Sequence, residues 1–117
     1  MDFLVGRNGE FDQFVSSAVR RAKNDIDDAN ISLILVLPYM TAEYANNKES
    51  FEEYYDEVEI FSSGHFKSAF QTRNRSMVDR SDLVVFCIDC SEGGAFQTAK
   101  YAKRAGKEYF NLGSLNL

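Results

Sequence analysis

Arg73 is the residue whose position is most unusual for its chemistry. In the helix predicted from about His65 to Arg80, at about 100° per residue, Phe66, Phe70, Arg73 and Met77 fall within about 60° of one another. Arg73 is therefore predicted to lie in the middle of an apolar stripe. A buried guanidinium has to be paired or bound to an anion, because an unpaired buried charge is very costly. Two interpretations stay open: contact with an anionic ligand, or a structural arginine that pairs with an acid or snorkels to the surface.

Two glycine-containing loops offer backbone N–H groups that could hold such an anion. The pair Gly93 and Gly94 follows an apolar strand and opens the last predicted helix, and open α/β folds bind anions at this place. Gly6 and Gly9 follow the first short apolar run, where a phosphate loop and a simple tight turn explain them equally well.

Other reactive residue types do not predict a catalytic centre of their own. The six carboxylates between residues 49 and 59 are typical of a solvated face, whereas acid–base catalysis needs an enclosed environment. Cys87 and Cys90 form a CxxC motif, which we interpret as a buried strand cysteine and a loop neighbour. His65 is the sole histidine, so a zinc site built on these thiols would be short of ligands. We predict no metal and no cofactor.

These residues are positioned by an alternating series of predicted strands and helices. The runs ISLILVL and LVVFCI are apolar on both faces, as strands buried on both sides of a parallel sheet are. Residues 40–50 are polar and predict a surface loop with some helical turns. The strands are predicted at 1–5, 31–37, 58–61, 83–88 and 108–112, and the helices at 10–26, 65–80 and 95–105.

This order predicts an α/β fold, a Rossmann-like three-layer α/β/α arrangement with a mainly parallel five-stranded sheet. Right-handed crossovers favour the strand order 3-2-1-4-5, in which the first and fourth strands are neighbours. The loop of Gly6 and Gly9 would then face the loop from Ser91 to Gly94 across one crevice, and Arg73 could close it.

Composition limits the classes of partner. The 117 residues predict a single domain, 1–117, and 44% apolar residues suffice for one core. The net charge of −5 argues against a nucleic-acid polymer as partner, since proteins that bind one usually carry a basic face. There is no apolar run of about 20 residues and no signal-like start. We therefore expect no membrane segment and a cytoplasmic location.

The segment RNRSMVDRSDLVVFCIDCSEGGAFQTAKYAKRAGKEYFNL resembles the SLOG superfamily of Rossmann-like nucleotide-binding domains, which includes the LOG phosphoribohydrolases and the DprA core. The opening VGRNGEFDQFV is similar to the first loop and helix of small stand-alone bacterial and phage members of unknown function. The resemblance covers most of the chain and is weakest from about residue 40 to 60. It implies a pocket for a nucleotide or nucleotide-derived ligand and a homo-oligomer, a dimer or larger.

The candidate site combines the two glycine loops with the polar residues of the helix before the fourth strand. Tyr39, at the carboxyl end of the second strand, could stack on a base, and Thr98 could add a hydroxyl. The candidate ligand-binding residues are Gly6, Arg7, Asn8, Gly9, Tyr39, Arg73, Asn74, Arg75, Ser91, Glu92, Gly93, Gly94 and Thr98.

Three functions follow from the resemblance. LOG hydrolases follow their glycine pair with Gly-Thr and a catalytic glutamate, but here Phe96 and Gln97 stand in the Gly-Thr region and Ala99 or Lys100 stands where the acid would be. Binding or sensing of a nucleotide-derived molecule is therefore the leading expectation. The alternatives are a LOG-type nucleotide N-glycosidase, with Glu92 as its acid, and a phage-type protein that sequesters a nucleotide defence signal.

Overall fold

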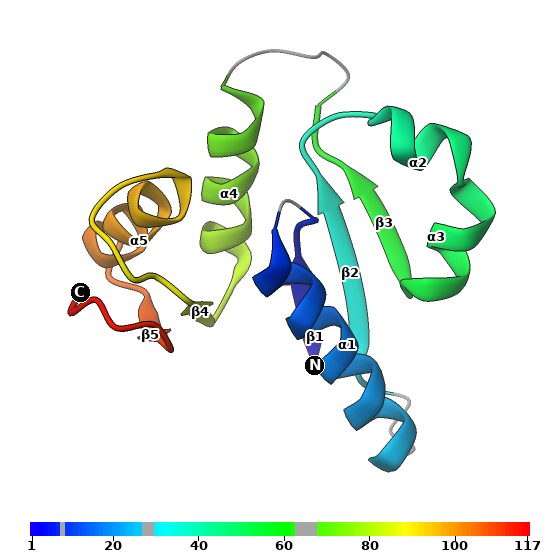
Figure 1. Cartoon of the computed structure of the whole chain (residues 1–117), viewed down its shortest axis with the longest axis horizontal. Coiled ribbons are helices and arrows are strands. Elements are labelled where there is room, and N and C mark those ends of the chain that lie inside the picture. Colours follow the sequence, from blue (N-terminus) through cyan, green and yellow to red (C-terminus); the bar gives the residue numbers. More distant parts are fainter. Residues whose placement is uncertain (8, 27–29, 63–67) are drawn as a thin grey trace. The chain divides into compact units, whose positions relative to one another are not determined.

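The chain forms two units in the computed structural model, Met1–Phe66 (unit 1) and Lys67–Leu117 (unit 2), and each is described by itself (Figure 1). The residues that the structure describes are 1–7, 9–26, 30–62 and 68–117. Three residues singled out in the sequence, Asn8, His65 and Phe66, lie outside these ranges. Within these ranges, none of the helices has both the length and the apolar character needed to cross a bilayer.

Unit 1 is a parallel three-stranded sheet in the order β1-β2-β3. Its elements are β1 (Asp2–Val5), α1 (Glu10–Ile26), β2 (Ser32–Leu37), α2 (Ala42–Asn46), α3 (Lys48–Tyr54) and β3 (Glu57–Ile60). Every residue of β2 from Leu33 to Leu37 is buried, which confirms the prediction of a strand enclosed on both faces. The prediction of a short third strand at the edge of the sheet is also confirmed.

The segment from 40 to 60 contributes buried side chains to the core of unit 1. The prediction that 40–50 is a surface segment with some helical turns is confirmed by α2 and the start of α3, except at Tyr44, which is buried. Tyr44, Phe51 and Tyr55 on and beside α2 and α3 are buried against β1, β2 and α1. The rings of Tyr44 and Phe51 meet edge to face, 5.4 Å apart between centroids. Thr41 caps α2 by accepting a hydrogen bond from the Tyr44 backbone N–H, 3.1 Å. The carboxylates of this segment are mostly on the solvated side, as expected.

Asp56, in the acidic run, connects three elements of unit 1. It accepts hydrogen bonds from the Leu33 backbone N–H, 2.7 Å, and from the Lys23 ammonium, 2.5 Å. Partial burial disfavours the charged carboxylate, but these two donors outweigh it and lower the pKa of Asp56. Asp56 thus connects α1, the start of β2 and the start of β3.

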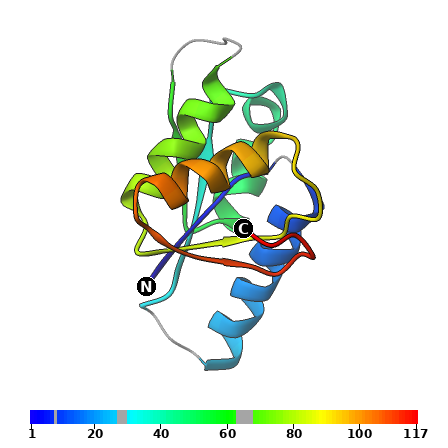
Figure 2. The same ribbon diagram turned by 90° about the vertical axis from the view of Figure 1, so that its left-hand side faces the viewer.

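Unit 2 contains a parallel pair of strands and two helices: α4 (Ala69–Arg80), β4 (Leu83–Phe86), α5 (Gly94–Arg104) and β5 (Glu108–Asn111). Figures 1 and 2 show α4 and α5 on the same side of the β4–β5 pair. Phe86 is buried on this side with Val78 of α4 and Ala99 and Ala102 of α5, and the alanines let α5 lie close to the strands.

One expectation about this half of the chain was wrong, that of a second strand buried on both faces. The described residues form a three-stranded and a two-stranded sheet, so the structure shows an α/β fold with parallel strands, and their joining into one five-stranded sheet stays a prediction. The strand orders within these two sheets agree with the predicted strand order 3-2-1-4-5. The run LVVFCI is not buried on both faces, because both helices of unit 2 cover the same side. Leu83, Val85 and Cys87 are exposed on the other.

Asn111 continues the pairing of β4 and β5 beyond the last backbone bridge. Its side chain accepts from the Ile88 N–H, 2.8 Å, and donates to the carbonyls of Ile88, 3.0 Å, and Leu115, 2.7 Å. It also accepts from Gly113 N–H, 3.1 Å, and a Cβ at Gly113 would collide with the backbone of Ile88. This contact fixes the start of the loop that leads from β4 to Gly93.

Candidate functional site

A chain of hydrogen bonds in unit 2 joins α4 to the first turn of α5. The Arg73 Nε donates to Asn74 Oδ1, 2.9 Å, and the Asn74 Nδ2 donates to Thr98 Oγ1, 3.2 Å. The Thr98 hydroxyl in turn donates to the Gly94 carbonyl, 2.9 Å. We call Arg73, Asn74, Thr98 and Gly94 the α4–α5 network. All four are candidate residues from the sequence, and the structure brings them together.

Arg73 is only 2% exposed, so the prediction that it lies on the buried face of its helix is confirmed. Ala69 and Val78 of α4 are buried with it. The guanidinium carbon lies 5.6 Å from the centre of the Phe70 ring, within the range of a cation–π contact. A positive charge enclosed in this way is screened less than one in water, so its field reaches neighbouring groups more strongly. Both interpretations of Arg73, ligand contact and structural pairing, stay open.

The start of α5 combines two features suited to an anion. Gly93 is the N-cap residue with a φ of 93°, a conformation that residues with a side chain rarely adopt, and it has no side chain to occupy the helix end. The first N–H groups of any helix lack intrahelical acceptors and carry the positive end of its dipole. Gln97 N–H is the first to bond back, to the Gly93 carbonyl at 3.1 Å. The first turn of α5 is exposed, as are Ser91 and Glu92 before it.

Gly94 lies against α4. The Gln71 Nε2 donates to the Gly94 carbonyl, 3.3 Å, and a Cβ on Gly94 would be 3.1 Å from that nitrogen. A side chain at this position would therefore push Gln71 aside. Sequence reasoning missed Gln71, although its place three residues before Asn74 put both side chains on the same side of the predicted helix.

Arg75 is separated from the α4–α5 network, although it was grouped with Arg73 and Asn74 in the candidate site. Its guanidinium carbon lies 5.3 Å from the centre of the ring of Tyr101, in the C-terminal half of α5. The Tyr101 hydroxyl donates to Asp79, 2.8 Å, and this hydrogen bond raises the pKa of Tyr101. Arg75 therefore contributes to the packing of α4 on α5 at the surface.

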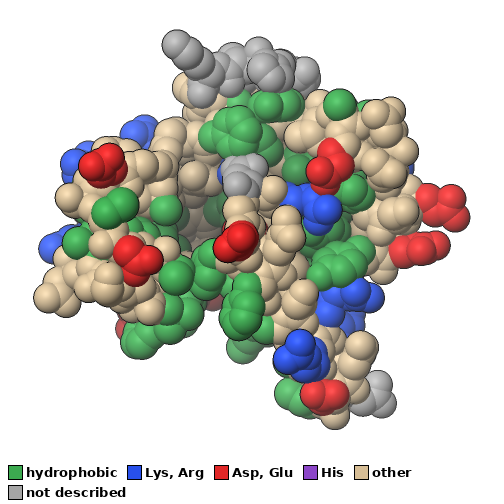
Figure 3. All heavy atoms as spheres, viewed as in Figure 1, with side chains coloured by type: hydrophobic (Ala, Val, Ile, Leu, Met, Phe, Trp, Pro, Cys, Tyr) green, Lys and Arg blue, Asp and Glu red, His purple; other side chains and the backbone are tan. Residues whose placement is uncertain are grey.

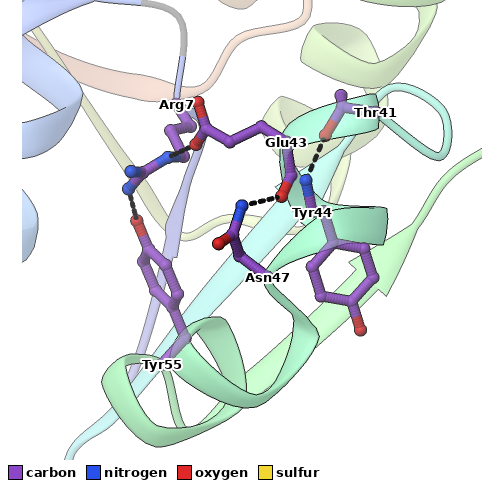
Figure 4. Close-up of polar contacts among 6 residues, drawn as sticks. All are labelled: Arg7, Thr41, Glu43, Tyr44, Asn47 and Tyr55. Atoms are coloured by element: carbon purple, nitrogen blue, oxygen red, sulfur yellow. Dashed lines mark hydrogen bonds and ion pairs between the residues drawn. The ribbon is translucent and has the colours of Figure 1, made fainter.

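The candidate residues of unit 1 centre on Arg7, directly after β1 (Figure 4). Its guanidinium forms an ion pair with Glu43 of α2 and donates to the Tyr55 hydroxyl, 3.0 Å. It also lies 4.7 Å above the centre of the Phe51 ring. Burial disfavours its charge, but the hydrogen bonds to Glu43 and Tyr55 raise the pKa of Arg7. An anion would have to compete with Glu43 for this cation.

A cleft of about 340 Å³ lies beside Arg7, lined by α1 and by the aromatic residues of α3. Its wall includes Ser16, whose hydroxyl is buried and donates to the Asp12 carbonyl, 2.9 Å, and also Tyr54 and Tyr55. Gly6 is buried and Gly9 is exposed, while Tyr39 is partly buried after the end of β2. These residues belong to unit 1, and the α4–α5 network belongs to unit 2.

The thiols and acids near the glycine pair form no second centre among the described residues. Cys87 and Cys90 are both free and exposed, so the prediction that Cys87 is buried was wrong, because Cys87 lies on the side of the chain that α4 and α5 do not cover. Hydrogen bonds from the Ser114 N–H and hydroxyl lower the pKa of Asp89 and hold its carboxylate on the C-terminal segment. No group of three or more His, Cys, Asp or Glu side chains suited to a metal occurs in the part of the chain described.

No family model matches this chain, and comparison with curated proteins gives no match either. The resemblance to the SLOG superfamily therefore stays a prediction.

Proposed function

We propose that this chain is a SLOG-like domain that binds or senses a nucleotide or a nucleotide-derived small molecule. The observation that carries the proposal is the α4–α5 network, which links a buried arginine to the exposed first turn of a helix that begins at a glycine pair. A phosphate at this turn would accept hydrogen bonds from backbone N–H groups near Gly94. The weakly screened charge of Arg73 would add to the favourable potential.

The proposal includes the arrangement of the sheet. In a Rossmann-like three-layer α/β/α fold with the order 3-2-1-4-5, the separate orders β1-β2-β3 and β4-β5 would join into one parallel sheet. The loop of Gly6 and Gly9 would then belong to the same ligand site, with Tyr39 available for a base. This wider site is a prediction that goes beyond the α4–α5 network.

A thermal-shift screen tests the proposal, with nucleotides, cyclic dinucleotides and ADP-ribose derivatives as probes. A probe present at about 100 times its dissociation constant should stabilise the protein by roughly 2.7 kcal/mol. Arg73→Gln keeps a polar side chain and removes the charge, and it should reduce this shift strongly. Arg75→Gln is the matched control, because Arg75 is a cation of the same helix outside the α4–α5 network.

Two outcomes would contradict the proposal. One is that no probe shifts the wild type. The other is that Arg73→Gln lowers the melting temperature while a probe shifts both proteins equally, which would identify Arg73 as a structural residue only.

The two alternative functions predict different outcomes with the same probes. A nucleotide N-glycosidase would release free base, and replacing Glu92 would stop the release. Glu92 is exposed in the loop before Gly93 and lacks the enclosed environment in which carboxylates carry out acid–base catalysis. A protein that sequesters a defence signal would bind one probe very tightly and return it unchanged.

A further inference from the structure

The cleft between α1 and α3 in unit 1 combines aromatic side chains with small polar ones. Its volume of about 340 Å³ is at the lower end of the range for ligand pockets, roughly 300–1,000 Å³. Figure 3 shows basic and hydrophobic side chains together at the surface where Figure 1 places these two helices. The walls of the cleft include Arg7, Ser16, Ser17, Ser50, Tyr54 and Tyr55.

Arg7 brings to this cleft a cation whose hydrogen-bonding capacity is only partly used. Of the five N–H groups of its guanidinium, one bonds to Glu43 and one to Tyr55, as Figure 4 shows, so three remain without a partner among the described residues. A carboxylate can therefore bind Arg7 beside Glu43, although the two share one positive charge. A phosphate, with nearly two negative charges, would match this partly neutralised cation less well.

The Tyr55 hydroxyl is a second donor, directly beside Arg7. Tyr55 is 3% exposed, and its hydroxyl oxygen accepts a hydrogen bond from Arg7 at 3.0 Å. Its own proton has no acceptor in the part of the chain that the structure describes. A buried donor without an acceptor is costly, so a ligand oxygen that accepts this proton would remove a penalty. Arg7 and Tyr55 together provide the neighbouring donors that a carboxylate group needs.

Tyr54 supplies a surface for the apolar body of a ligand. Its side chain is partly exposed, and its ring meets the Tyr55 ring edge to face, 4.8 Å between centroids. The Arg20 guanidinium lies 4.1 Å from the centre of the Tyr54 ring, so a second cation is close to the cleft. An aromatic ring packs well against such a wall, and the exposed hydroxyls of Ser17 and Ser50 could bond a polar substituent on it.

We propose that this cleft binds a small aromatic carboxylate, with its charged group on Arg7 and Tyr55 and its ring on Tyr54. This site is separate from the α4–α5 network, because every residue of the cleft wall belongs to unit 1. The helices α1, α2 and α3 pack on one face of the β1-β2-β3 sheet. In the strand order 3-2-1-4-5, right-handed crossovers would put α4 and α5 on the other face, so the proposed fold leaves the cleft open to solvent.

Titration with benzoate and para-hydroxybenzoate, followed in two-dimensional amide NMR spectra, tests the proposal. Saturable shifts should appear for residues 13–17 and 50–55, with a dissociation constant of about 1 mM, a realistic value for ligands of about ten non-hydrogen atoms. Benzamide, the neutral analogue, should bind about 10-fold more weakly, because hydrogen bonds to a charged group are the stronger ones. Cyclohexanecarboxylate keeps the charge without the aromatic ring and should also bind more weakly than benzoate.

Two pairs of variants locate the site. Ser17→Phe fills the cleft from α1 and should abolish binding, whereas Ala18→Phe, at the next exposed position of the same helix outside the cleft, should leave it unchanged. Tyr55→Phe removes one donor and keeps the ring, so it should weaken binding by about 10-fold. Tyr101→Phe, which removes a hydroxyl in unit 2, should not weaken it. Circular dichroism will verify that each variant is folded.

Several results would overturn the proposal. One is the absence of saturable shifts at benzoate concentrations about ten times the expected dissociation constant, and another is shifts confined to unit 2. Equal affinity for benzoate and benzamide, or for benzoate and cyclohexanecarboxylate, would refute the recognition of an aromatic carboxylate. Binding that is equal in Ser17→Phe and Ala18→Phe, or unchanged in Tyr55→Phe, would place the ligand outside this cleft.

Discussion

Replacing Asn111 should destabilise the protein far more than a change at a partly exposed strand end normally does. Asn111→Ala removes the acceptor of the Ile88 and Gly113 N–H groups and the donor to the Leu115 carbonyl, whereas the Ile88 carbonyl keeps a hydrogen bond from Leu115 N–H, 3.1 Å. Each polar group left without a partner costs about 1–3 kcal/mol, and the lower part of this range applies because Asn111 is only partly buried. We therefore expect the free energy of unfolding to fall by roughly 3–6 kcal/mol, a large part of the total for a small domain.

Urea denaturation followed by circular dichroism measures this loss. Asn111→Asp keeps the acceptor for the Ile88 N–H but places a carboxylate against the Leu115 carbonyl, so it should restore only part of the stability. Asn116→Ala is the matched control, since Asn116 is exposed in the same segment. If Asn111→Ala lowered the free energy of unfolding no more than Asn116→Ala does, the amide of Asn111 would not hold the two strands together. Our account of this contact would then fail.

Three further predictions follow from other contacts. Gly113→Ala should lower the melting temperature markedly, because the new Cβ collides with the Ile88 backbone. An unchanged melting temperature would show that the backbone at this contact can move to accommodate the Cβ. The lowered pKa of Asp56 contributes stability above the unfolded-state value of about 3.9, and this contribution disappears as pH falls through the folded-state value. Asp56→Asn should therefore flatten the acid side of a stability–pH curve, and a curve parallel to that of the wild type would contradict this. Glu43→Gln should change stability by less than about 1 kcal/mol, because the pair is partly exposed, while freeing Arg7 to strengthen anion binding several-fold in titration calorimetry. Anion binding that is unchanged or weaker in this variant would place Arg7 outside the ligand site.

The parts of the structure that could be predicted from the sequence are those set by local periodicity. The helical phase of Arg73 predicted its burial, and the strand in ISLILVL was predicted because every position in it is apolar. The run LVVFCI has the same pattern, yet one of its faces is exposed. The hydrophobic periodicity of a sequence shows that a face of a strand is apolar. It does not show whether a second layer of the same chain covers that face.

The contacts that sequence reasoning missed join residues far apart in the chain. Arg7 meets Glu43 and Tyr55 only because β1 and β2 are neighbours, and no spacing in the sequence records that distance. The aromatic residues of the segment 40–60 were visible, with Tyr44 and Phe51 seven residues apart as on one side of a helix. The surrounding carboxylates obscured this pattern, because such a density of charged residues is typical of a segment exposed to solvent.

The absence of any hairpin among the described strand pairs has a consequence for how the chain folds. β1 pairs Asp2 with Ser32 and β4 pairs Leu83 with Glu108, so each of these two sheet contacts closes a loop of about 25–30 residues before it is stabilised. In both cases the intervening residues include a helix, α1 or α5, which shortens the span once it has formed. We expect the refolding rate to depend on the helix propensity of α1 and α5 more than on the strands. An alanine-to-glycine change on the exposed side of either helix should therefore slow refolding in stopped-flow measurements.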